Sequence, residues 1–306
     1  MAEASTDRFM RRLALLVAIC LLLQACSAVR LGYGNADSLA RWWIDQYVDL
    51  APDQDLLLRE RLSGFLAWHR KTQLPDYVLV LRQGQQVVDG QPTVGDMLKL
   101  SEGIIRRARN LSDRATPDIA DFLATVNSAQ IARMAGRFTE KNSDYATEAK
   151  LAEDENAQRR ARYKRLLERA EYWFGDFSDA QAESLRQLIG GQSAGSQFWY
   201  EERLRRQREW LDLVRLVERE RPPRDKLMRL LHDYAARFDL PADPARLSQA
   251  VALRRAAAEL AVAIHALTTP EQRAHARHKL DDLIHDFTEL SQADQAELPT
   301  RTSPRQ

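Results

Sequence analysis

The sequence predicts an all-α fold, a multi-helix bundle of about nine or ten helices. Charged residues make up 29% of the chain, which has only 12 glycines and 11 prolines among 306 residues. This composition is typical of long, solvated helices. Apolar residues recur at the three- and four-residue spacing of one helical face, and capping residues mark where such segments begin.

The expected helices cover, in chain order, residues 37–47, 53–71, 93–110, a segment from 116, then 144–174, 178–190, 196–220, 225–238, 243–267 and 269–290. The first two segments carry their large apolar side chains at helical spacing. Thr116-Pro117-Asp118 supplies a capping hydroxyl, a proline at the first helical position and an acidic first turn. A new helix is therefore expected to begin there.

Prolines mark the later boundaries. Pro222-Pro223 ends one expected helix, and Asp243-Pro244 opens another. The tail, residues 291–306, has no apolar periodicity and is expected to be disordered.

One stretch allows two interpretations. Pro75 favours the start of a turn or helix, but residues 77–81 (Tyr-Val-Leu-Val-Leu) have the composition of a strand. A short hairpin near residues 77–90 is the alternative to a helix, and periodicity alone does not decide between them.

The run Leu13–Leu23 is apolar throughout and follows two arginines. As a helix it would extend over about 16 Å, roughly half the apolar core of a bilayer, which suits the central region of a signal peptide. Residues 1–25 are therefore expected to be a signal peptide. A start at Met10 would remove two acidic residues from its N-terminal region and is the alternative to Met1.

Leu23-Gln24-Ala25-Cys26 fits the bacterial lipobox, which predicts cleavage between Ala25 and Cys26. The small side chain before the cysteine lets the peptidase approach, and the Cys26 thiol would carry diacylglycerol, with an N-acyl chain added after cleavage. No other cofactor is expected. Because Cys20 would leave with the signal peptide, the mature chain would have no free thiol for a disulfide, catalysis or a metal.

Ser27, rather than aspartate, follows the lipidation site, and by enterobacterial sorting this favours the periplasmic face of the outer membrane. Residues 26–35 are expected to be the lipidated N-terminus and a linker, and residues 36–290 a helical domain. The near balance of 45 Lys and Arg against 44 Asp and Glu argues against a nucleic-acid partner. The expected partners are the membrane, through the lipid, and another envelope protein or an unfolded client.

Three expected helix starts have the same pattern, with glutamine at the third helical position. They are Leu50-Ala51-Pro52-Asp53-Gln54, Phe177-Ser178-Asp179-Ala180-Gln181 and Thr268-Thr269-Pro270-Glu271-Gln272. Ser178 with Gln181, and Thr269 with Gln272, predict complete capping boxes, whereas Ala51 allows only the half made by the glutamine. The pattern resembles the LTxxQ motif of periplasmic stress chaperones, all-α proteins that present a concave surface to unfolded clients, although no copy matches it fully.

A broader resemblance depends on the segment from Cys26 to Tyr33, on Trp42-Trp43, and on the stretches 67–77 and 198–210. The chain resembles a family of proteobacterial lipoproteins of unknown function. The resemblance implies lipidation and a helical body, and it implies no activity.

The last expected helix carries the weak candidates for a metal site, His275, His278, Asp282 and His285, within about 80° of arc. An i,i+4 pair of histidine and aspartate offers nitrogen and oxygen ligands to Zn²⁺ or Ni²⁺, but an ordinary solvated face has the same pattern. The sequence has no Gly-x-Ser-x-Gly, no glycine-rich phosphate loop and no His-Glu-x-x-His. No catalytic residue is therefore assigned, and the chain is expected not to be an enzyme.

Trp42, Trp43 and Tyr47 form an aromatic cluster shortly after the anchor. Packing into the helical core is the favoured interpretation, and contact with the membrane interface is the alternative. Three functions remain: an outer-membrane-tethered lipoprotein that contacts or supports other envelope components, a chaperone-like or stress-sensing protein that binds clients, and a metal-binding protein.

Overall fold

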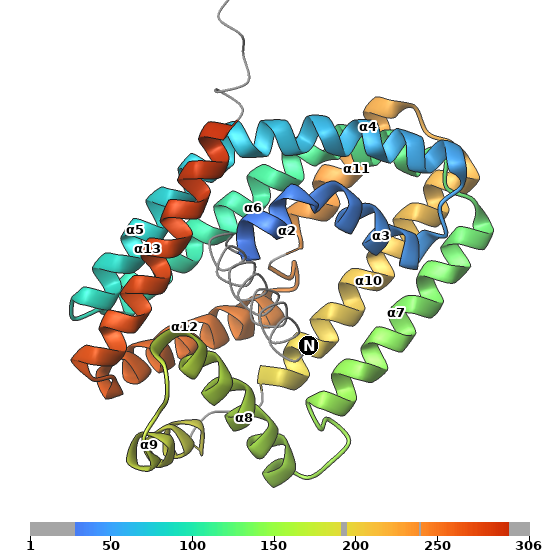
Figure 1. Cartoon of the computed structure of the whole chain (residues 1–306). Coiled ribbons are helices and arrows are strands. Elements are labelled where there is room, and N and C mark those ends of the chain that lie inside the picture. Colours follow the sequence, from blue (N-terminus) through green and yellow to red (C-terminus); the bar gives the residue numbers. More distant parts are fainter. Residues whose placement is uncertain (1–27, 191–194, 239, 294–306) are drawn as a thin grey trace, which may run out of the picture.

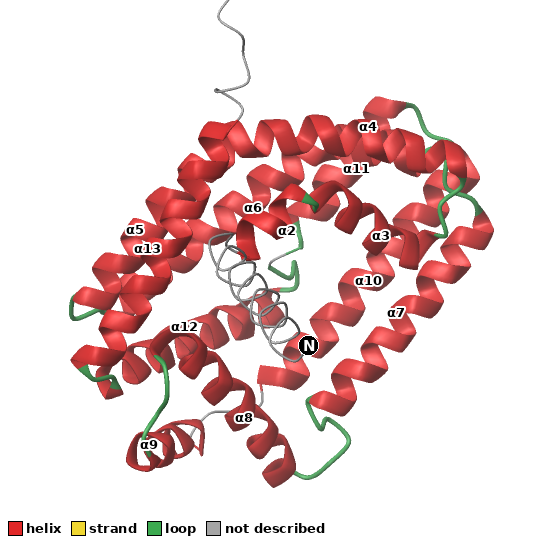
Figure 2. Cartoon of the chain, in the orientation of Figure 1, coloured by secondary structure: helices red, strands yellow, loops and turns green. Residues whose placement is uncertain are grey.

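The computed structural model of the chain describes residues 28–190, 195–238 and 240–293 (Figure 1). These residues form twelve α-helices and one π-helical turn, with no strand among them (Figure 2). The helices of the first half are α2 (Ala28–Gly34), α3 (Ala36–Val48), α4 (Pro52–Trp68), the π-turn η1 (His69–Gln73), α5 (Leu74–Asp89) and α6 (Val94–Leu123). Those of the second half are α7 (Ser128–Glu148), α8 (Glu155–Phe174), α9 (Asp179–Gly190), α10 (Gly195–Glu220), α11 (Arg224–Ala236), α12 (Pro244–Leu267) and α13 (Pro270–Gln292).

The all-α prediction is confirmed, and the last helix of the described chain packs on helices of the first half. In Figure 1 the last helix, α13, lies along α5, and this pair has the most extensive contact of any two helices. α11 and α12 both pack on α6, and α7 lies against α3 and α10. The largest core cluster draws its buried side chains from α3, α4, α6, α7, α10 and α11.

The hairpin considered near residues 77–90 is wrong, because α5 runs through this stretch from Leu74 to Asp89. Its apolar residues are spaced for a helix, and Val78, Val80 and Val88 are buried. The linker expected over residues 26–35 is also corrected, since residues 28–34 form α2.

A new helix does not begin at Thr116, because α6 continues through Pro117 to Leu123. The hydroxyl of Thr116 donates to the carbonyl of Ser112 at 2.8 Å, within the same helix, instead of capping a new one. The proline costs the helix one backbone hydrogen bond. Packing of α4, α5, α10, α11 and α12 on α6 holds the helix together across it.

The segment expected as one helix over residues 144–174 is two helices, α7 and α8. Lys150 lies between them with φ of 57°, a left-handed conformation that interrupts the helix. Asp154 then caps α8, accepting from the backbone N–H of Ala157 at 2.8 Å. With α2 and α5 added, this division raises the helix number above the nine or ten expected.

No helix in the described part of the chain is both long and apolar enough to cross a bilayer. The disorder expected for the tail concerns residues that lie almost entirely outside the described ranges, since α13 ends at Gln292.

Four helices, α4, α7, α9 and α13, begin with a capping glutamine at the third position, and these four glutamines form two reciprocal pairs. In the first glutamine clasp, Gln54 of α4 and Gln130 of α7 donate to each other's side-chain oxygen at 3.2 and 2.6 Å. In the second glutamine clasp, Gln181 of α9 and Gln272 of α13 do the same at 2.8 and 3.2 Å. Each clasp thus joins the N-termini of two helices that are distant in the sequence.

The two clasps use the same backbone acceptors. Gln54 donates to the carbonyl of Thr125, two residues before the N-cap of α7, and Gln130 donates to that of Asp49, two residues before the N-cap of α4. The second clasp repeats this with the carbonyls of Leu267 and Asp176. The four bonds measure 3.2, 3.1, 2.7 and 2.7 Å. The chain therefore contains one helix-start junction built twice.

The glutamines also complete the capping boxes of their own helices. Gln181 and Gln272 accept from the backbone N–H groups of Ser178 and Thr269, whose hydroxyls accept in return from the glutamines' N–H groups. Before α4, where the cap is alanine, only the backbone N–H to Gln54 bond forms, at 3.1 Å. The residue four positions after each glutamine is buried, namely Leu58, Met134, Leu185 and Ala276.

Candidate functional site

An apolar groove of about 460 Å³ lies among α3, α4, α6, α7 and α10. Six aromatic side chains contribute to its lining: Trp43, Tyr47, Phe65, Phe122, Phe138 and Trp210. Only three polar side chains reach it, Arg61, Asp118 and Gln207. Pockets that are mostly apolar with a few polar groups are the usual form of a binding site.

The first glutamine clasp positions two walls of the groove. One turn after Gln54, Leu57 and Leu58 of α4 line the groove, and one turn after Gln130, Met134 of α7 does so. The clasp holds the N-termini of α4 and α7 together. It therefore fixes the distance between these two helices at the end of the groove nearest the clasp.

The edge of the groove exposes an indole ring. Trp43 is 57% exposed although it lines the groove, and its ring lies 4.9 Å from that of Tyr47. The neighbouring Trp42 is 63% exposed and does not line the groove. The interpretation that these tryptophans pack into the core is therefore wrong, whereas Tyr47 does pack against the core and lies 5.7 Å from Phe138.

The polar groups at the edge are already paired with one another. Arg61 lies 3.3 Å from Asp121 and 3.9 Å from Asp118, and Arg224 contacts Asp121 at 2.7 Å. The hydrogen bond to Asp121 raises the pKa of Arg224. Since these charges are paired with each other, the surface of the groove is mainly apolar.

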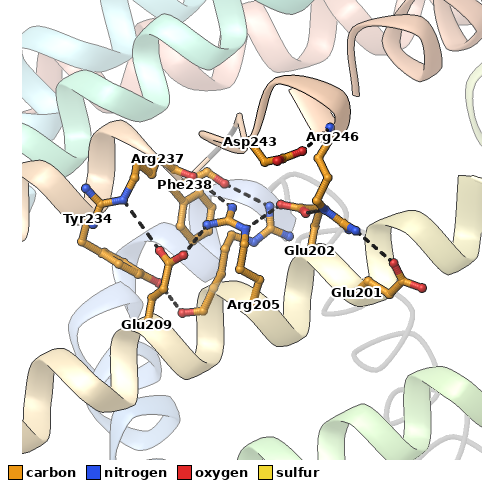
Figure 3. Close-up of polar contacts among 10 residues, drawn as sticks. Glu201, Glu202, Arg205, Glu209, Tyr234, Arg237, Phe238, Asp243 and Arg246 are labelled. Atoms are coloured by element: carbon orange, nitrogen blue, oxygen red, sulfur yellow. Dashed lines mark hydrogen bonds and ion pairs between the residues drawn. The ribbon is translucent and has the colours of Figure 1, made fainter. Parts of the chain in front are cut away.

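α10 supplies Gln207 and Trp210 to the groove, and an ionic network holds this helix against α11 and α12 (Figure 3). At its centre is Glu202, which is only 1% exposed. Glu202 accepts from Arg246 of α12 at 2.6 Å and from Arg205 at 2.8 Å. Burial opposes ionisation of Glu202, but the hydrogen bonds from the two arginines outweigh it, so its pKa is lowered.

The network extends to the end of α11. Arg205 also contacts Glu209 at 2.8 Å and donates to the carbonyl of Arg237 at 3.1 Å. Tyr234 of α11 donates to the carbonyl of Arg206 at 3.2 Å, and its ring lies 5.3 Å from that of Trp210. Burial raises the pKa of Tyr234 to about 12, so the phenol stays protonated as a donor.

A second polar site lies where α4 continues into η1. The Tyr33 hydroxyl of α2 lies 2.7 Å from Nδ1 of His69, the first residue of the π-turn. Burial lowers the pKa of His69, which favours a neutral ring whose Nδ1 accepts from the hydroxyl. Arg30 of α2 forms an ion pair with the buried Asp286 of α13 at 3.0 Å. These contacts fasten α2 to the body of the protein.

The histidines of α13 do not form a site. His275, His278 and His285 are exposed, and Nε2 of His278 lies 3.7 Å from Asp282 with both side chains largely in solvent. No group of three or more potential metal ligands occurs within residues 28–190, 195–238 and 240–293. Ala25 and Cys26, the expected cleavage and lipidation residues, lie outside the described residues.

Of the residues that build the groove and its clasp, the sequence singled out only Trp43, Tyr47 and Gln54, and it did not show that they belong to one site. Gln130 could have been found, because Asn127-x-x-Gln130 has the capping-box pattern with asparagine in place of a hydroxyl residue. Glu202 and Asp286 carry no such signal, since their burial depends on helices distant in sequence.

Residues 46–239 match DUF6279, a family of unknown function. The match covers α4 to α11 and most of the groove, but neither α12 nor α13. No curated protein and no solved structure matches the chain. None of these comparisons supports the finer resemblance to LTxxQ stress chaperones. Because the match covers more than half of the sequence, the chain belongs to the DUF6279 family.

Proposed function

We propose that this protein is a non-enzymatic, lipid-anchored envelope protein whose helical body binds an apolar segment of another protein. The observation that carries the proposal is the apolar groove, with its aromatic lining and exposed Trp43 at the edge. Aromatic side chains are enriched where proteins bind one another, because they bury much apolar area at little cost in conformational entropy.

The shape and chemistry of the groove favour a protein segment with large apolar side chains. Its side chains come from five helices, and Met134, an adaptable side chain, lies among them with its sulfur 3.2 Å from Nε1 of Trp210. Such a surface accommodates varied aliphatic and aromatic groups. This agrees with the chaperone-like function among the three that the sequence left open.

Replacing Trp43 by alanine is expected to weaken binding of an apolar segment about tenfold or more, because exposed aromatic anchors carry much of the energy of such contacts. The probe is a fluorescently labelled amphipathic Leu/Lys peptide, titrated with the purified full chain and followed by fluorescence anisotropy. The matched control is Trp42→Ala, which removes an equally exposed indole from the next position outside the groove.

The comparison distinguishes binding in the groove from nonspecific binding to exposed apolar side chains. Trp42→Ala is expected to change the affinity less than twofold. Equal losses in the two variants, or no binding of the peptide to the native chain, would contradict the proposed use of the groove.

The anchor is proposed at Cys26, on the strength of the lipobox Leu23-Gln24-Ala25-Cys26. Lipidation would place α2 next to the membrane, because α2 begins at Ala28. From there the groove would face other proteins of the envelope, with Ser27 favouring the periplasmic face of the outer membrane.

Cys26→Ser is expected to abolish lipid modification and signal-peptide cleavage at this position. Mass spectrometry of the N-terminus checks this, because the native protein should begin with a cysteine that carries diacylglycerol and an N-acyl chain. A native N-terminus that retains residues 1–25, or that is cleaved elsewhere without lipid, would contradict the anchor. Membrane fractionation alone is insufficient, since the uncleaved apolar run can also retain the variant.

A further inference from the structure

A second pocket, of about 480 Å³, lies where α8, α9, the start of α10 and α12 meet. It shares no residue with the apolar groove. α8 contributes three arginines, Arg162, Arg165 and Arg169, while α10 and α12 contribute Trp199 and Leu253. The pocket therefore combines strong positive charge with apolar surface.

The three arginines are spaced three and four residues apart, so they share one face of α8. In the described part of the chain none of the three forms an ion pair. Arg165 donates only to a backbone carbonyl, that of Glu148, at 3.1 Å. The acidic residue of the pocket, Glu259, is already held by Arg255 at 3.0 Å. Three arginines and one glutamate thus line the pocket, and the glutamate is paired with an arginine that does not line it.

Arg162 is the most unusual of the three. Its Nε and Nη1 atoms have no access to solvent and no hydrogen-bond partner. Burial, followed by the positive charge of Arg159, lowers the pKa of Arg162, with Glu155 opposing and Arg165 adding to the effect. Because these two atoms are closed off from the pocket, Arg162 would bind an anion there through its other guanidinium nitrogen, Nη2, which is not buried in this way.

The start of α10 adds to the positive field. Gly195 and Ser196, its first two residues, line the pocket, and the N-terminus of a helix carries partial positive charge. The helix approaches α12 closely here, because a Cβ atom on Gly195 would lie only 3.2 Å from Leu253. A side chain at this position would require Leu253 to shift by a few tenths of an ångström.

We propose that this pocket binds a phosphate group carried on an apolar molecule, with a phospholipid as its source. One guanidinium group can donate two parallel hydrogen bonds to two oxygens of a phosphate. Three arginines on one helix face offer several such donors to the same phosphate group. The apolar side chains beside them, Leu166, Ile189, Trp199, Leu253 and Leu260, would contact the first part of the acyl chains. A free phosphate ion would leave this apolar surface in water, so the lipid is the better fit.

The test is isothermal titration calorimetry on the full chain in a non-ionic detergent. The ligands are dihexanoyl phosphatidic acid, glycerol 3-phosphate, inorganic phosphate and uncharged dihexanoyl glycerol. We expect phosphatidic acid to bind most tightly and its affinity to fall as salt is added. Arg162→Gln combined with Arg165→Gln and Arg169→Gln should weaken this binding about tenfold or more.

The matched control is Arg160→Gln, which removes an exposed arginine of the same helix outside the pocket. It should change the affinity less than twofold, and the thermal melting of all variants should show that they fold. Equal losses in the control and the triple variant, or no binding of any phosphate ligand, would overturn the site. Glycerol 3-phosphate binding as tightly as phosphatidic acid would overturn the assignment to a lipid.

Discussion

Gln130→Ala is expected to lower the free energy of unfolding by about 2–4 kcal/mol. The buried Gln130 side chain donates to Asp49 and Gln54 and accepts from Asn127 and Gln54. Alanine removes all four bonds, so the Asp49 carbonyl and the Asn127 N–H lose their glutamine partner, whereas Gln54 keeps its bonds to Thr125 and Ala51. Each buried polar group left unpaired costs about 1–3 kcal/mol. Denaturant unfolding followed by circular dichroism measures the change.

Two further variants show whether polarity or volume causes this loss. Gln130→Glu keeps the shape but places carboxylate oxygen against the Asp49 carbonyl, so it should also destabilise. Gln181→Ala, the corresponding change in the half-buried second clasp, should cost less, because water can reach the groups it leaves behind. A Gln130→Ala protein as stable as the native one would refute the structural role of the clasp.

Glu202→Ala is the second large effect, with an expected loss of about 3–5 kcal/mol. Removing one partner of a buried ion pair leaves the other without compensation. Arg205 would keep its contacts with Glu209 and the Arg237 carbonyl, and Arg246 would keep its contact with Glu201, which sets the lower end of this range. Urea unfolding at neutral pH measures the change.

The control for Glu202 is its neighbour. Glu201 is 45% exposed and pairs with Arg246 at 3.2 Å, so Glu201→Ala should cost only about 0–1 kcal/mol. The pKa of Glu202 is lowered in the folded protein, so its contribution is present above its ordinary pKa near 4.5 and is lost as the pH falls through the folded value. Equal losses in the two variants would show that burial of Glu202 has no energetic role.

Helices with strong local signals could be predicted from the sequence, because capping and amphipathic spacing act within a few residues. Ser178 and Thr269 are at the helix starts where their patterns place them. Local signals failed where packing overrides them. Pro117 lies within α6, and the strand-like residues 77–81 are in α5, since both helices are covered by others.

The candidate site depends on contacts that a single sequence does not contain. The clasps join glutamines that are 76 and 91 positions apart in the sequence. The residues around one glutamine do not indicate which distant glutamine it will bind. Glu202 lies in a helix rich in charged residues, and only its contact with Arg246, which belongs to the distant α12, distinguishes it from its exposed neighbours. The tryptophans at 42 and 43 were expected in the core, but both side chains are more than half exposed among the described residues.

The match to the family ends at residue 239, whereas the second clasp needs Gln272 and α5 needs α13. A fragment that ends at residue 239 would therefore expose the face of α5 that α13 covers. It would also leave the side-chain amide of Gln181 without its partners Leu267 and Gln272. We therefore expect that residues 46–239 alone do not fold as they do in the intact chain. Expression, proteolysis and domain-transfer experiments on this protein should treat residues 28–292 as indivisible.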